Sequence, residues 1–166
     1  MRVTPDGFRS SERRNPDRSH VTEQCVRASR PVVPFTEDGA RMLGHRYWVE
    51  VTRASRGVVR CTETKELVEL TALGVRPALL RFGGAEVTVE SDAVSCVYRI
   101  RGGLLSLGEG GTLCVSQIGR EPLELRVLVD GFLARLGGGA LYGLQRRAHL
   151  AVSRRFIRQL LLGALS

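Results

Sequence analysis

The sequence lacks the short motifs that mark several common kinds of enzyme. It contains no Gly-x-Ser-x-Gly turn, no pair of histidines at metal-binding spacing and no phosphate-binding loop with a lysine, and Lys65 is its only lysine. These absences argue against hydrolase, metalloenzyme and kinase chemistry. We therefore predict no catalytic residue, no metal ligand and no cofactor, although an enzyme that works through the shape of a cavity stays open.

Long apolar runs and paired cysteines are missing too. No window approaches the ~18 apolar residues that a membrane-spanning helix needs, and the N-terminus shows no apolar signal segment. None of the cysteines has a neighbour at metal or redox spacing, and a reduced cysteine in a strand behaves as a small apolar residue. These features favour a cytoplasmic protein. The cysteines are Cys25, Cys61, Cys96 and Cys114.

Aromatic residues are scarce, at 5% of a chain of 166 residues, whereas apolar residues of all kinds make up 43%. Leu and Val must therefore supply most of any core. Residues 1–20 are rich in Arg, Ser, Asn, Asp and Pro and have almost nothing to bury, which predicts a disordered leader. The length of the remainder predicts one domain over residues 21–166.

What the chain does contain is a long amphipathic pattern at its C-terminal end. Residues 140–166 are free of proline and carry apolar side chains at a period of ~3.6 residues, which predicts one long helix. Gly163 stands where such a helix is expected to stop. The predicted apolar side consists of Leu141, Leu144, Ala148, Val152, Phe156 and, further round, Ala151.

Positive charge gathers on the same helix. The net charge is +8, and residues 141–166 contribute five arginines and no acid, or +5. Arg147, Arg154 and Arg158 share the side opposite the apolar residues. A basic helix face of this kind can bind nucleic acid or an anionic membrane surface. We favour the alternative interpretation, a solvated surface.

The segments between residues 44 and 130 alternate apolar and polar residues at a period of two, which predicts strands. Their spacing, with Gly or polar turns between them, is typical of an antiparallel meander. Residues 77–82 are predicted to be irregular. The predicted strands cover residues 47–52, 58–62, 67–73, 85–89, 94–100, 113–118 and 123–129. We thus expect an α+β fold, an antiparallel sheet of about six or seven strands curved around one long C-terminal helix.

The residues before this meander give weaker signals. Val21, Cys25 and Ala28 fall at helical spacing, and two valines lie between Pro31 and Pro34, so a short helix and an edge strand are both open here. Thr36 is followed by two acids, the pattern of an N-cap and a first helical turn. A short helix from Thr36 to about residue 43 is therefore predicted.

The order of elements resembles the helix-grip, or START-like (SRPBCC, Bet v 1-like), superfamily over residues 45–163. The ends of several bacterial members are similar to Arg135-Leu136, Leu141-Tyr142, His149, Val152 and Arg155-Phe156-Ile157-Arg158. The resemblance implies a cavity between the sheet and the last helix. Members of the superfamily open with a strand and two helices that cover the mouth of this cavity, a pattern that residues 1–44 match loosely.

The candidate site residues lie on the apolar faces of the predicted strands and of the predicted C-terminal helix. Each has a structural alternative: a tyrosine ring can belong to the core, and a helical histidine can simply bond the sheet. Gly137, Gly138 and Gly139 are placed like a phosphate loop, but no further βαβ unit follows, so we interpret them as a hinge. The candidate ligand-binding residues are Tyr47, Tyr98, Tyr142, His149 and Phe156.

Three functions stay open at this point. The first is binding of an apolar or amphipathic small molecule in the implied cavity. The second is an interaction of the basic helix face, through Arg147, Arg154 and Arg158, with nucleic acid or an anionic membrane. The third is a cyclase or dehydratase of the same superfamily.

Overall fold

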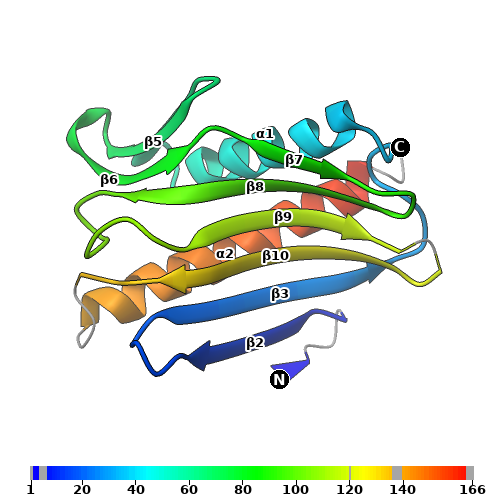
Figure 1. Ribbon diagram of the computed structural model, residues 1–166, viewed down its shortest axis with the longest axis horizontal. Helices are drawn as coiled ribbons and strands as arrows, with labels where there is room; N and C mark the ends of the chain where they lie inside the picture. The colour runs from blue at the N-terminus through cyan, green and yellow to red at the C-terminus, as the bar shows by residue number, and fades with distance from the viewer. Residues whose placement is uncertain (1, 4–6, 120, 136–139, 164–166) are drawn as a thin grey trace.

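A computed structural model describes residues 2–3, 7–119, 121–135 and 140–163 of the chain. In this part the strands form one open, antiparallel sheet of ten strands, and two helices lie on one face of it (Figure 1). The α+β class and the antiparallel sheet are confirmed, and the sheet has more strands than the six or seven predicted. The elements are β1 (Arg2–Val3), β2 (Arg9–Arg14), β3 (His20–Ala28), α1 (Glu37–Ala54), β4 (Val59–Glu63), β5 (Leu67–Ala72), β6 (Val75–Gly83), β7 (Glu86–Val89), β8 (Ala93–Gly102), β9 (Thr112–Ile118), β10 (Leu123–Phe132) and α2 (Ala140–Gly163).

The strand order is β1-β2-β3-β10-β9-β8-β6-β5-β4, and β7 pairs with β8 beyond the end of β6. The register defines the two ends of the sheet. Leu123 pairs with Ala28 at one end and Phe132 with His20 at the other. We call the end at Phe132, where α1 ends and α2 begins, the mouth end, and the opposite end the far end (Figure 1).

Side chains along the central strands point alternately to the two faces of the sheet. Those on the face toward the helices form a continuous buried row. Tyr98 of β8 pairs with Leu113 of β9, and Val127 of β10 pairs with Val115 of β9. All four are nearly inaccessible to solvent. The period-two pattern therefore predicted β4, β5, β7, β8, β9 and β10 correctly, because on these strands one face meets the helices and the other meets water.

The helix α1 is where the sequence prediction was most clearly wrong. Its N-cap is as expected, since the Gly39 amide donates to Thr36 Oγ1 at 3.2 Å. It then continues to Ala54 through the segment 47–52 that was predicted to be a strand. Tyr47 and Trp48, neighbours in sequence, are both buried. Adjacent residues of a strand point to opposite faces, whereas both can lie within the broad apolar face of a helix.

The first twenty residues also differ from the prediction. Residues 9–14 form β2, so a disordered leader was wrong for this segment, and His20–Ala28 form a strand rather than a short helix. Residues 77–82, expected to be irregular, belong to β6. The ladder between β2 and β3 needs only main-chain hydrogen bonds, so a strand with almost no apolar residues can form at a sheet edge. Arg9 adds an ion pair to Glu124 of β10.

The helix α2 runs from Ala140 to Gly163, close to its predicted bounds. It contacts α1 as well as β3. Its buried side is rotated from the predicted one: Ala148 and Ala151 are exposed, and Leu141 and Leu144 lie outside the described side chains. Among the described side chains of α2, the buried ones are those of Ser153, Phe156, Ile157 and Leu160.

Candidate ligand-binding pocket

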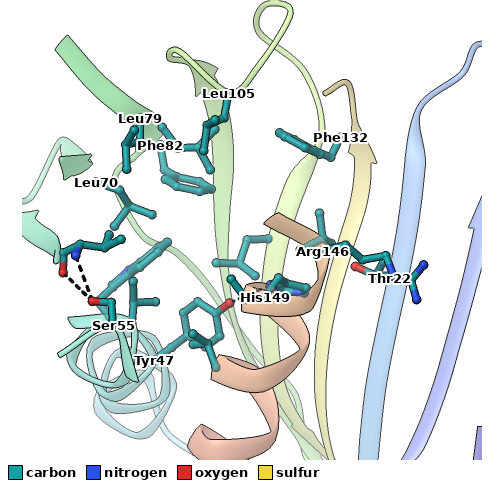
Figure 2. Close-up of a pocket in the computed structure, with 18 of the residues that line it drawn as sticks. Thr22, Tyr47, Ser55, Leu70, Leu79, Phe82, Leu105, Phe132, Arg146 and His149 are labelled. Carbon is teal, nitrogen blue, oxygen red and sulfur yellow. Dashed lines mark hydrogen bonds between the residues drawn. The ribbon is translucent and has the colours of Figure 1, made fainter. Parts of the chain in front are cut away.

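A pocket of about 420 Å³ lies at the mouth end, between the sheet and the two helices. Figure 2 shows Leu79, Leu105 and Phe132 along one part of its wall, with Tyr47 and His149 at the opposite part. The apolar lining from the sheet side includes Leu70, Leu79, Leu80, Phe82, Ile100, Leu113, Val129 and Phe132. The helices add Tyr47, Trp48, Val51, Ala54, Ala148, Ala151 and Val152.

The ring of Trp48, which α1 contributes to the pocket wall, packs against aromatic rings of the sheet. The Trp48 ring lies 5.0 Å from the Phe82 ring and 5.0 Å from the Tyr98 ring, measured between centroids. The indole is 2% exposed, and its N–H has no hydrogen-bond partner among the described residues. The indole therefore contributes its ring, rather than its N–H, to the pocket wall.

Tyr47 and His149 meet where α1 and α2 approach each other. The Tyr47 hydroxyl lies 3.2 Å from His149 Nδ1. Burial lowers the pKa of His149 to about 4 and raises the pKa of Tyr47 to about 12. Both groups are therefore neutral near pH 7. His149 Nε2 is also buried and has no partner among the described residues.

Polar side chains gather on one side of the pocket, where α2 faces β3. His20 and Thr22 of β3 and Arg146 of α2 line this side together with His149. Arg146 Nε lies 3.4 Å from Glu12 Oε2, so the guanidinium is held at the pocket by an ion pair with β2. Burial, and then the nearby Arg14, lower the pKa of His20. The lining is thus apolar over most of its area and polar along one side.

The remaining polar residue of the lining, Ser55, has a different role. Its hydroxyl donates to the Thr52 carbonyl at 3.0 Å, and the Val59 amide donates to it at 3.0 Å. These bonds close the turn between α1 and β4, and Figure 2 shows those between Ser55 and Val59. Because they occupy the hydroxyl, the polar chemistry of the pocket stays on the side of α2 and β3.

The structure brings two of the five predicted ligand-binding residues into the pocket, Tyr47 and His149. Tyr98 and Phe156 do not line it. The Tyr98 hydroxyl donates to Glu63 Oε1 at 3.3 Å, and the Phe156 ring packs edge-on against Tyr47 with 5.4 Å between centroids. Both are core residues, 1% exposed. The side chain of Tyr142 lies outside the described residues.

Sequence reasoning missed several residues of the pocket. Trp48 was assigned only to a predicted strand, and Phe132 and Arg146 were not singled out. His20 was assigned to the leader. His20 lies next to Phe132 only because β3 pairs with β10. The periodicity of a short sequence segment does not predict which strands pair.

The basic face predicted on α2 is not a uniform row of free cations. Arg147 is exposed and Arg154 is half-buried. The Arg158 guanidinium lies over the Phe8 ring, 5.9 Å from its centroid. Residues 137–139, interpreted above as a hinge, lie outside the described residues.

Comparison with known proteins gives no family for this chain, since no protein-family model, no curated protein and no solved structure matches it. Within the described residues, no three His, Cys, Asp or Glu side chains are grouped so as to hold a metal ion. The helices of this part of the chain are too short or too polar to cross a membrane. All four cysteines are free.

Proposed function

We propose that the protein binds an amphipathic small molecule in the pocket between the sheet and the two helices. The observation that carries this proposal is a space of about 420 Å³ with a largely apolar lining. Ligand sites typically enclose about 300–1,000 Å³ and combine apolar walls with a few polar groups. Protein interiors are otherwise close-packed, so an open space of this size with an apolar lining is a suitable place for a ligand.

The distribution of polar groups supports an orientation for the ligand. Its apolar body would lie against Trp48 and Ile100, and its polar end would face the side formed by His20, Arg146 and His149. Arg146 is the charged group of the lining. We therefore infer that the ligand has a carboxylate or another anionic group at one end.

The strand order supports the helix-grip architecture as part of the same proposal. The strand β3 lies beside the last strand, β10, and α1 follows β3 before the remaining strands begin. This matches the opening strand and helical segment that the resemblance implies, with one continuous helix in place of two. The preceding hairpin, β1 and β2, adds to that plan.

Binding is favoured over acid–base catalysis by the state of His149. A general base is most effective when its pKa lies near the working pH. The pKa of His149 is lowered to about 4 by burial, so the imidazole is a weak base. Its position beside Tyr47 suits a hydrogen-bonding role toward a ligand better than proton transfer.

The experiment uses the fluorescence of Trp48, the single tryptophan, which lines the pocket. The protein would be titrated with an alkyl carboxylate, the alkyl alcohol of equal length and a polycyclic aromatic compound. We expect saturable changes with the alkyl ligands and tighter binding of the carboxylate. Mass spectrometry of an organic extract of the purified protein would identify any ligand that is carried through purification.

A matched pair of variants tests the inferred orientation. Arg146→Gln should weaken carboxylate binding by roughly threefold to fivefold, the scale of an exposed ion pair, and leave alcohol binding unchanged. Arg147→Gln, one residue further and outside the pocket lining, should change neither. No saturable signal with any of the three ligands, together with a clean extract, would contradict the proposed function.

A further inference from the structure

Exposed apolar side chains gather around the opening of the pocket. In the described part of the chain, five of the eight exposed large hydrophobic residues lie at the mouth end, and the other three, Met42, Val89 and Leu162, lie toward the far end. Leu73, Val75 and Leu107 are 63%, 65% and 61% exposed. The five are Val58, Leu73, Val75, Leu104 and Leu107.

Hydrogen bonds place four of these residues next to the pocket, and the fifth, Val75, pairs with Ala72 at the β5–β6 turn. The Leu73 amide donates to the Val58 carbonyl, and Val58 precedes the pocket residue Val59. The Leu104 amide donates to the carbonyl of Ala78, and the Leu107 amide donates to that of Leu133. The loop 104–107 therefore closes the mouth end between β6 and the end of β10. We call these five side chains the apolar rim.

Positive charge without a carboxylate partner among the described residues lies at the same end of the molecule as the apolar rim. Arg56 precedes Val58 in the turn after α1, and Arg60 extends along the β5–β6 turn, with its Cδ 3.4 Å from the position of a Cβ at Gly74. Arg135 Nε donates to the Ser106 carbonyl. Arg147 lies near the start of α2. These four arginines are exposed, and within the described residues none of them pairs with a carboxylate.

The far end carries charges of both signs. Five exposed acids lie there at the start of α1 and in the turns that end the central strands, and the exposed Arg27, Arg30 and Arg41 lie among them. None of them forms an ion pair in the described part of the chain. Exposed charge is therefore mixed at the far end, whereas the four arginines named above give the pocket opening unpaired positive charge. The acids are Glu37, Asp38, Glu90, Asp92 and Glu121.

From this arrangement we propose that the mouth end docks on an anionic phospholipid bilayer, with the apolar rim inserted at the surface and the four arginines against the headgroups. Apolar side chains flanked by Lys or Arg are the combination that binds membrane interfaces. Docking in this orientation places the pocket opening against the acyl chains. An amphipathic ligand then passes between bilayer and pocket without crossing water. This transfer rests on the proposed function, whereas the binding of the protein to the bilayer does not.

The apolar contribution is tested by vesicle co-sedimentation. Phosphatidylcholine vesicles would be compared with vesicles that also contain phosphatidylglycerol, and the wild-type protein should bind the second kind. The double variant Leu73→Asp with Leu107→Asp should bind about tenfold more weakly or worse, because each leucine loses its burial in the interface. The matched control, Met42→Asp with Val89→Asp, changes exposed apolar residues away from the rim and should bind like wild type.

The charge contribution is tested on the same vesicles. Arg56→Gln and Arg147→Gln should each weaken binding by about fivefold, since a basic residue near an anionic surface contributes about 1 kcal/mol. Added salt should weaken wild-type binding, and it should have less effect on a variant that combines Arg56→Gln with Arg147→Gln.

Three outcomes would overturn the proposal. The wild-type protein could ignore phosphatidylglycerol vesicles, or the Met42/Val89 variant could lose as much binding as the Leu73/Leu107 variant. Light scattering during gel filtration could instead show that the Leu73/Leu107 substitutions break a dimer, which would make the rim an interface between two copies. Trp48 fluorescence in vesicle-free buffer separates this test from that of the proposed function, because rim variants should bind the alkyl carboxylate as wild type does.

Discussion

The Tyr47 hydroxyl and His149 Nδ1 lie 3.2 Å apart and join α1 to α2 at the pocket. The pair contains two neutral groups at pH 7, and the second imidazole nitrogen has no partner among the described residues. Such a pair is sensitive to pH, because protonation would place a charge in a buried site.

The first prediction concerns the stability of the folded protein at acidic pH. Burial lowers the pKa of His149 from 6.5 to about 4, so between these values the unfolded chain binds a proton that the folded protein does not. The contribution to stability is complete above pH 6.5 and is lost as the pH falls toward 4. It amounts to roughly 3 kcal/mol at about 1.4 kcal/mol per pKa unit.

Urea denaturation at a series of pH values measures this effect. The free energy of unfolding of the wild type should fall more steeply between pH 6.5 and 4 than that of His149→Leu. His20, whose pKa is also lowered, acts in the same direction in both proteins and does not affect the difference. Parallel pH profiles would show that His149 is protonated normally in the folded protein.

A second prediction uses two glycines of the helices. A Cβ added at Gly44 of α1 would overlap the Tyr98 hydroxyl and lie 2.7 Å from Cys96 Sγ, whereas one at Gly143 of α2 meets nothing within 4 Å. Gly44→Ala should therefore lower the free energy of unfolding by about 1–3 kcal/mol. Gly143→Ala should raise it by about 0.5–1 kcal/mol, since alanine favours a helix. Thermal or urea unfolding measures both, and equal effects would contradict the close contact of α1 with β8.

A third prediction compares two buried glutamines. Gln117 Oε1 accepts from the amides of Val32 and Val33, at 2.8 and 3.2 Å, and its Nε2 donates to the Val33 carbonyl at 2.9 Å. Gln24 is 1% exposed, and neither amide atom has a partner among the described residues. Gln117→Leu should cost roughly 2–3 kcal/mol, because it leaves buried main-chain groups unpaired.

Gln24→Leu is the matched comparison. It removes a buried amide that gains nothing from its surroundings, so the free energy of unfolding should stay the same or rise. A large loss of stability on this substitution would mean that Gln24 has a partner in solution.

The fourth prediction concerns the size of the pocket. Ala151→Phe adds a ring at the pocket lining, and we expect it to weaken binding of the alkyl carboxylate by at least about tenfold. Gln159→Phe places the same ring on an exposed position of α2 outside the lining. It should leave the Trp48 titration unchanged. If both variants bind the ligand as wild type does, the ligand does not occupy this space.

Much of the fold could be predicted from the sequence, because most strands have one solvent-exposed face and one face that packs against the helices. Ala85, Val87 and Val89 alternate with polar residues, and β7 was identified from this pattern. The prediction failed at α1, where Tyr47, Val49 and Val51 imitate a strand over a window that is shorter than two helical turns. It failed again at β3, which has buried residues on both faces and therefore no clear period.

The site was predictable only in part. The periodicity of α2 located His149, and the apolar rows located Tyr47. The rest of the pocket depends on which segments meet in space: Arg146 faces β3 because β3 pairs with β10. Tyr98 and Phe156 have the same kind of neighbours in sequence as Tyr47, so no local pattern separates the core from the pocket lining.

The polar strand at the border of the sheet also has a consequence for the protein in concentrated solution. A molecule cut before His20 would end in a strand that is partly apolar on both faces and has one row of free amides and carbonyls. Two such borders could join main chain to main chain and start a fibre-like stack. The six residues of β2, arginines and serines with one glutamate, cover this row with a polar strand instead.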